Sequence, residues 1–226
     1  MEIIYEDNHL IAVNKNCHEI VQGDRTGDTP LADMLKLWIK ERYGKPGNVF
    51  AGVVHRLDRP VTGAVLFART SKALTRLNEM FRLGEVRKIY WAIVADAPQQ
   101  PEGELVHWLA RNEKQNKSYV VDAERPDAKK AVLHYRLLAR SARYCLLEID
   151  LKTGRHHQIR CQLAHIGLPV RGDLKYGAPR SNPDGGICLH ARRIAFTHPV
   201  SRLPVGITAP VPDDRLWQAL AASVVP

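Results

Sequence analysis

A single carboxylate between two arginines is the residue of this chain best placed to do chemistry. Residues 55–63 read HRLDRPVTG, so Asp58 stands between Arg56 and Arg59. Short apolar runs precede and follow this stretch, and its proline and glycine are typical of a turn. The pattern predicts a polar loop between buried strands, where a carboxylate is exposed yet held still. Such a group can attack an electrophilic carbon or accept a proton, whereas a weak surface ion pair is the alternative interpretation.

A second informative stretch, residues 152–167, reads KTGRHHQIRCQLAHIG. Its apolar positions follow the repeat of a helix and comprise Ile159, Leu163 and Ile166. We expect a helix that begins at Thr153 or Gly154. It should end at Gly167, because glycine commonly terminates helices and Pro169 follows closely.

Two arginines, Arg155 and Arg160, flank the apolar stripe of that helix. A buried arginine needs a carboxylate partner to offset the loss of its hydration, and Asp58 is an available one. The adjacent residues His156 and His157 resemble a pair of metal ligands. Neighbouring positions on a helix point to different faces, however, so we predict no metal site.

The other elements must position these residues. Strand patterns cover residues 2–5, 10–15, 87–94, 104–110, 131–139, 144–151 and 187–197. Helices are expected after the caps Thr29 (with Pro30 in the first turn), Ser71 (ending at Gly84) and Asp213 or Asp214. The polar residues 111–130 predict an exposed hairpin that could form an arm over a ligand. The whole pattern favours an α+β fold with a large, mixed, mostly antiparallel sheet, in a single domain over residues 1–226.

Composition narrows the class of partner. The 226 residues include 33 Lys and Arg against 24 Asp and Glu, which gives a net charge of +9. This excess predicts an anionic partner, with nucleic acid favoured over membrane. No apolar run is long enough to span a bilayer, and the N-terminus does not resemble a signal peptide. We therefore expect a cytoplasmic protein that does not bind membranes.

Five short motifs, in order between residues 52 and 191, resemble those of the RluA family of pseudouridine synthases. HRLDRPVTG is similar to the family's HRLDxxTSG, and KIYWAIV to its KxYxA segment. GRHHQIRCQL is similar to GRxHQIRxxL, GDLKYG matches GDxxYG, and ICLHA is similar to the LHA strand. The opening EIIYEDNHLIAVNK also fits the family, so the resemblance covers nearly the whole chain.

The chain departs from the family pattern at several places. Val61-Thr62-Gly63 stands where the family usually has Thr-Ser-Gly, and NKNCH stands for NKPxG. We also expect no S4-like RNA-binding domain before the catalytic part, so the catalytic domain itself should contact RNA. None of these departures affects Asp58.

The resemblance implies a pseudouridine synthase fold with a catalytic cleft across the sheet, and an RNA isomerase that converts uridine to pseudouridine in rRNA or tRNA. It places the catalytic aspartate at Asp58, with Arg160 as the partner that keeps this carboxylate ionised and aimed. Tyr90 would stack on the flipped base and take the C5 proton, although simple core packing is its alternative role. Asp58 could attack C6 of the uracil or C1′ of the sugar, or help to remove the C2′ proton. These routes stay open.

RNA contacts are implied for further residues. Arg56 would fill the space left when the uridine leaves the stack, and Arg155 and His157 would support loops or phosphates. A hydrogen-bonded structural role is the alternative for His157. No cofactor or metal is implied, the partner is structured RNA, and a monomer is expected. A non-catalytic RNA-binding module and an aspartate-dependent phosphotransferase are the competing functions. The phosphotransferase would need a second carboxylate beside Asp58, and the loop has none.

Overall fold

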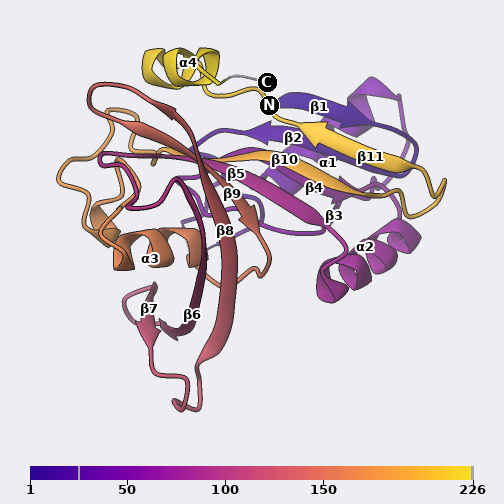
Figure 1. The fold of residues 1–226 in the computed structure, drawn as a ribbon. Coiled ribbons are helices and arrows are strands. Elements are labelled where there is room, and N and C mark those ends of the chain that lie inside the picture. The colour runs from indigo at the N-terminus through magenta and orange to yellow at the C-terminus, as the bar shows by residue number, and fades with distance from the viewer. Residues whose placement is uncertain (25, 225–226) are drawn as a thin grey trace. The chain divides into compact units, whose positions relative to one another are not determined.

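The computed structural model describes residues 1–24 and 26–224. Most of its elements are strands, with a few helices between them (Figure 1). The strands are β1 (Glu2–Glu6), β2 (Leu10–Lys15), β3 (Gly52–Val53), β4 (Thr62–Ala68), β5 (Arg87–Val94), β6 (Glu102–Asn112), β7 (Lys117–Val121), β8 (Lys129–Arg140), β9 (Cys145–Leu151), β10 (Leu189–Thr197) and β11 (Pro204–Thr208). The helices are α1 (Leu31–Arg42), α2 (Ser71–Leu83), α3 (Gln158–His165), the short 3-10 helix η1 (Leu174–Tyr176) and α4 (Arg215–Ala222). The predicted strands are all present, within a few residues of their expected bounds.

Contacts between residues cluster into two compact units. The first unit comprises Met1–Val86 and Arg193–Pro210, and the second comprises Arg87–Arg192 and the residues from Val211. The single domain expected over residues 1–226 stays a prediction.

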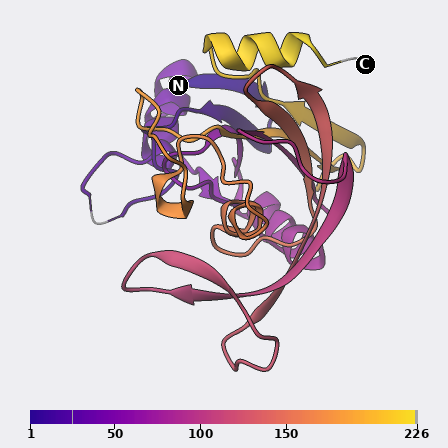
Figure 2. The same cartoon turned by 60° about the vertical axis from the view of Figure 1, so that its left-hand side comes forward.

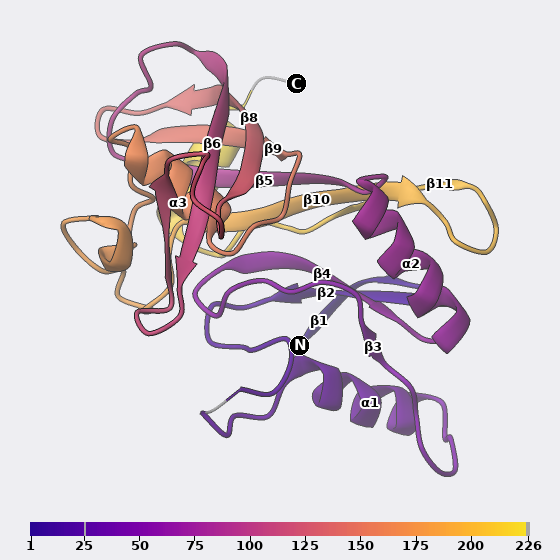
Figure 3. The ribbon, with the colours of Figure 1, turned by 90° about the horizontal axis from the view of Figure 1, so that it is seen from below.

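The first unit is built on the antiparallel strands β1, β2 and β4, whose apolar residues alternate between two buried faces. One face, which includes Leu10 and Leu66, packs against Leu77 of α2. The opposite face includes Val13 and Phe67, both fully buried. Figure 3 shows α1 on the other side of these strands from α2, so each face of this layer is covered by one helix.

The helices of the first unit begin at different caps from those expected. Pro30, not Thr29, is the N-cap of α1 and gives no side-chain cap. Backbone carbonyls of Ile20 and Val21 instead accept hydrogen bonds from the first two N–H groups of the helix, at 2.8 and 3.3 Å. For α2 the cap is Thr70, one residue before the predicted Ser71, while Gly84 ends the helix in the left-handed conformation as predicted.

The second unit is built on an antiparallel sheet in which β5 pairs with β9, β9 with β8, β8 with β6, and β6 with β7. The predicted hairpin over residues 111–130 is confirmed, because β7 folds back on the far end of β6. Figure 2 shows this hairpin running away from the other strands of the unit. Helix α3 packs on β6 and β7 near the base of the hairpin, and α4 packs on β8.

Candidate active site

Asp58 lies in a loop between β3 and β4, as the sequence predicts. The side chain is half-buried, and the Asp58 carbonyl accepts a hydrogen bond from the Val61 N–H at 3.0 Å, which closes a turn. The neighbouring Arg59 pairs with Asp28 at 2.6 Å and with Asp24 at 3.3 Å. The Asp58 carboxylate therefore lies in a short, defined turn, and Arg56, two residues earlier, is exposed.

A buried lysine that the sequence did not single out clamps this turn. Lys15, at the end of β2 and 1% exposed, donates hydrogen bonds to the carbonyls of Asn16 (2.7 Å), Arg59 (2.8 Å) and Val61 (2.7 Å). Its ammonium group thus ties the strand to both sides of the turn that follows Asp58. Burial lowers the pKa of Lys15 from 10.5 to about 8, although the charge of Asp58 is among those that oppose this shift. The sequence feature that could have indicated a role for Lys15 is its position at the end of an apolar strand.

In the second unit, α3 begins at Gln158 and not at Thr153 or Gly154. The Arg155 N–H donates to the Gln158 side chain at 3.0 Å, and the Gln158 N–H donates back to the Arg155 carbonyl at 3.1 Å. These bonds form a turn ahead of the helix. The predicted end is confirmed, because Gly167 follows the last turn with a positive φ of 79°. Arg155 is exposed and donates to the carbonyl of Lys130 at 2.9 Å.

Arg160 is buried in the first turn of α3, and its carboxylate partner in the second unit is Asp173. Its Nε donates to Oδ2 of Asp173 at 2.6 Å, and its Nη2 donates to Oδ1 at 2.9 Å. The sequence predicted that a buried arginine here needs a carboxylate, but it did not identify Asp173. The signal for Asp173 was its place in the GDLKYG motif. Asp58 belongs to the first unit, and its pairing with Arg160 stays a prediction.

His157 caps α3 in the left-handed conformation (φ 52°) and is buried. Its Nδ1 is hydrogen-bonded to the Tyr176 hydroxyl at 3.0 Å, and that hydroxyl also accepts from the Ser118 N–H at 2.8 Å. Burial, followed by the charge of Arg160, lowers the pKa of His157 to about 2, so the ring is neutral near pH 7. A neutral, buried imidazole favours the hydrogen-bonded structural role over a phosphate contact.

Tyr90 lies within β5, opposite Ile149 of β9, and is 9% exposed. The neighbouring β5 residues Trp91 and Ile93 are also buried. Tyr90 thus occupies a rigid strand, where its ring orientation is fixed by packing.

Comparison with known proteins decides the family. A family model described as RNA pseudouridylate synthase matches residues 9–165. The chain belongs to this family. A ribosomal large subunit pseudouridine synthase D from Xylella fastidiosa is 37% identical over 236 residues, covering 98% of this chain and 69% of the relative. A tRNA pseudouridine synthase C from Vibrio cholerae is 31% identical over 97% of this chain and 94% of the relative.

Solved structures agree on the fold of this pseudouridine synthase. Human RNA pseudouridylate synthase domain containing 4 superposes with a TM-score of 0.80 at 24% identity, over 98% of this chain and 92% of the human one. The predicted family, the α+β pseudouridine synthase fold and the RNA isomerase activity are confirmed. The residues to which the resemblance gave catalytic roles stay predictions.

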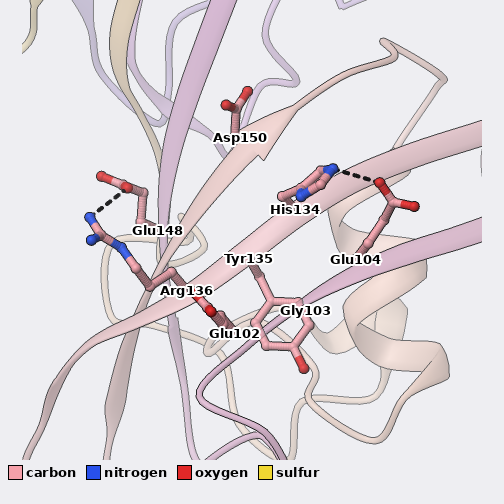
Figure 4. A pocket seen from close by; sticks show the side chains of 8 residues that line it. All are labelled: Glu102, Gly103, Glu104, His134, Tyr135, Arg136, Glu148 and Asp150. Atoms are coloured by element: carbon pink, nitrogen blue, oxygen red, sulfur yellow. Dashed lines mark hydrogen bonds and ion pairs between the residues drawn. The ribbon is translucent and has the colours of Figure 1, made fainter.

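A depression of about 480 Å³ lies in the second unit of the synthase. It is lined by Glu102, Gly103, Glu104, His134, Tyr135, Arg136, Glu148 and Asp150 (Figure 4). Within it, His134 contacts Glu104 at 2.5 Å and Arg136 forms an ion pair with Glu148 at 3.0 Å (Figure 4). Carboxylates outnumber cations among these residues, so the depression is unsuited to RNA phosphates.

No group of His, Cys, Asp or Glu side chains within residues 1–24 and 26–224 could hold a metal ion. In the same part of the chain, none of the helices has the length and apolar character needed to cross a membrane.

The buried Lys15 makes the stability of the synthase depend on pH in a defined direction. Because folding lowers its pKa from 10.5 to about 8, burial of the ammonium group costs free energy below pH 8. The folded protein loses this cost as the pH rises from 8 to 10.5. The free energy of unfolding gained across that range is about 3 kcal/mol. The free energy of unfolding of the native protein should therefore rise, relative to that of Lys15→Met, across this window.

Urea unfolding of both proteins at a series of pH values measures this difference. Lys36→Met, which removes an exposed lysine of α1, is the matched control. The difference in unfolding free energy between the native protein and Lys36→Met should not change with pH in this window. A difference between native protein and Lys15→Met that is flat or falls with pH would contradict the buried ammonium.

Proposed function

We propose that this pseudouridine synthase modifies a uridine in rRNA or tRNA, the RNA classes named for its relatives, with Asp58 as the catalytic carboxylate. The observation that carries the proposal is the clamped turn at Asp58. A half-exposed carboxylate stands there next to a backbone that the buried Lys15 holds at two carbonyls. A group fixed in this way can meet a reacting atom without first being ordered, which is a large part of what enzymes contribute to rate.

The reaction rearranges bonds within one nucleotide. The bond between N1 of uracil and C1′ of ribose breaks, the base rotates, and C5 bonds to C1′ while the C5 proton leaves and N1 gains one. The Asp58 carboxylate would begin this sequence by attack on C6 or C1′, or by helping to remove the C2′ proton. Each route uses an ionised carboxylate and needs neither a metal nor an organic cofactor.

Two residues of the second unit complete the proposed catalytic set. Arg160 would keep the Asp58 carboxylate ionised and aimed, since a cation nearby favours the charged form. Tyr90 would stack on the uracil with its ring and accept the C5 proton through its phenol group. The burial of both side chains supports these roles, because packing fixes their orientation.

RNA binding would draw on the excess of positive charge and on specific residues. Arg56, exposed beside Asp58, would enter the space left by the flipped uridine, since a planar guanidinium stacks as well as pairs. Arg155 would contact phosphate, while the burial of His157 supports a role in holding the turn before α3. Flipping costs a few kcal/mol of stacking, so contacts to the flanking RNA must supply that energy.

We also propose that the enzyme is a cytoplasmic monomer that acts on structured RNA and does not bind membranes. Ribosomal and transfer RNA, the substrates named for its relatives, support this location. Size-exclusion chromatography with light scattering would test the monomer.

A comparison of pseudouridine maps tests the function. Total RNA from cells with and without the gene should differ at one or a few uridines of rRNA or tRNA. Restoring the gene should restore these sites, whereas a gene that encodes Asp58→Asn should not. Identical maps in all strains would reject the proposal. Restoration by the Asp58→Asn gene would instead favour a non-catalytic RNA-binding module.

A further inference from the structure

The guanidinium of Arg160 is held by the carboxylate of Asp173 in a fork-to-fork arrangement. Two parallel hydrogen bonds of 2.6 and 2.9 Å join the pair, and the side chains are only 6% and 1% exposed. This geometry fixes the plane of the guanidinium as well as its distance, which a single contact cannot do. It uses Nε and one Nη2 hydrogen of the guanidinium.

Asp173 is in turn fixed by the backbone around it. Its N–H donates to the Val170 carbonyl at 3.0 Å, and its own carbonyl accepts from the N–H groups of Tyr176 and Ala178, both at 3.0 Å. The preceding Gly172 has φ +88°, and a Cβ there would lie 2.9 Å from the Gly186 carbonyl oxygen. Only glycine fits this backbone without strain. The loop therefore presents the carboxylate in one position.

Neighbouring side chains support the same orientation. The ring of Tyr176 lies against Arg160, with 5.1 Å between the guanidinium carbon and the ring centroid. The Tyr176 hydroxyl is anchored to the Ser118 backbone at 2.8 Å, so the ring cannot swing away. His157 stays neutral beside this pair and adds no competing positive charge.

We propose that Asp173 is a positioning residue of the synthase, which acts on the reaction only by holding Arg160 in its productive orientation. This inference rests on the proposed function, because it takes Arg160 to act at the uridine. Asp173 would touch neither the RNA nor the reacting atoms, since its side chain is 1% exposed and directed at the guanidinium. Its effect should therefore appear in the chemical step and not in RNA affinity.

Asp173→Glu and Asp173→Asn test the proposal in single-turnover reactions with saturating enzyme. Asp173→Glu keeps the charge but shifts the carboxylate by one methylene, so a slower rate in this variant reports on geometry. We expect each folded variant to react about 10²-fold more slowly, because small misplacements of catalytic groups have effects of this size. RNA affinity should change by less than about threefold. If circular dichroism shows that Asp173→Asn does not fold, Asp173→Glu alone carries the test.

Asp150→Asn is the matched control, because it also removes a carboxylate that pairs with cations in the second unit, Arg87 and Lys152. It should keep the native rate. Adding Asp173→Asn to Arg160→Met should cost little beyond Arg160→Met alone, since Asp173 has then no partner to position. A folded Asp173→Glu with the native rate, while Arg160→Met is slow, would overturn the positioning role. A native rate in Arg160→Met would overturn the proposed role of Arg160 itself.

Discussion

Asp58→Asn should reduce pseudouridine formation by about 10³-fold or more, the largest effect expected of any single substitution in this chain. The amide is nearly isosteric with the carboxylate, so the turn closed by the Asp58 carbonyl and the Val61 N–H should be kept. An amide neither attacks carbon as a nucleophile nor accepts a proton at neutral pH, so every route open to Asp58 is lost. Single-turnover conversion of the mapped RNA, measured with purified protein, gives the rate.

RNA affinity separates lost chemistry from lost binding. Removing a negative charge should leave the affinity of Asp58→Asn for RNA equal to that of the native protein or higher. Asp33→Asn, which makes the same change of charge on the exposed surface of α1, should keep the native rate. A rate for Asp58→Asn within about tenfold of native would mean that another group performs the first step.

Tyr90→Phe should slow the release of the C5 proton by about 10²-fold, the usual contribution of a positioned general base. The substitution keeps the ring, and with it the packing of β5 against β9 and the proposed stacking on uracil. Release of tritium from RNA labelled at C5 of uridine follows this step directly. Tyr90→Leu should react more slowly still, because it removes the aromatic face as well, a stacking energy of about 1–3 kcal/mol.

Tyr135→Phe is the matched control for this substitution. Tyr135 lies on β8 in the same unit and is also 9% exposed, but its ring covers Gly103 of β6. Tyr135→Phe removes a hydroxyl as well, but it should release tritium at the rate of the native protein. Equal rates for Tyr90→Phe and the native protein would restrict Tyr90 to stacking or core packing.

The sequence predicted those parts of the structure that depend on local pattern. The loop at Asp58 followed from the apolar runs on each side of it, and the end of α3 followed from Gly167. Local rules also placed the predicted hairpin at residues 111–130, where a polar segment joins two strands.

Interactions with distant residues were beyond these rules. The first two N–H groups of α1, those of Leu31 and Ala32, bond to the carbonyls of Ile20 and Val21, so the Thr29 cap predicted from its residue type was wrong. Lys15 bonds to carbonyls 44 and 46 residues away, and nothing in its own neighbourhood predicts this. The cost of burying a charge correctly predicted that Arg160 has a carboxylate partner. It could not identify the partner, because only the folded structure brings Asp173 next to Arg160.

The clamp made by Lys15 has a consequence for how the turn after Asp58 can vary in evolution. Lys15 binds the main-chain oxygens of Arg59 and Val61, which every amino acid possesses, and not their side chains. The hydrogen bonds of Lys15 therefore do not depend on which amino acid stands at position 61. The side chain there must only fit a buried site, since Val61 is 2% exposed. A valine can replace the hydroxyl residue usual in the family at this place, and relatives with other small apolar residues there should keep the same turn.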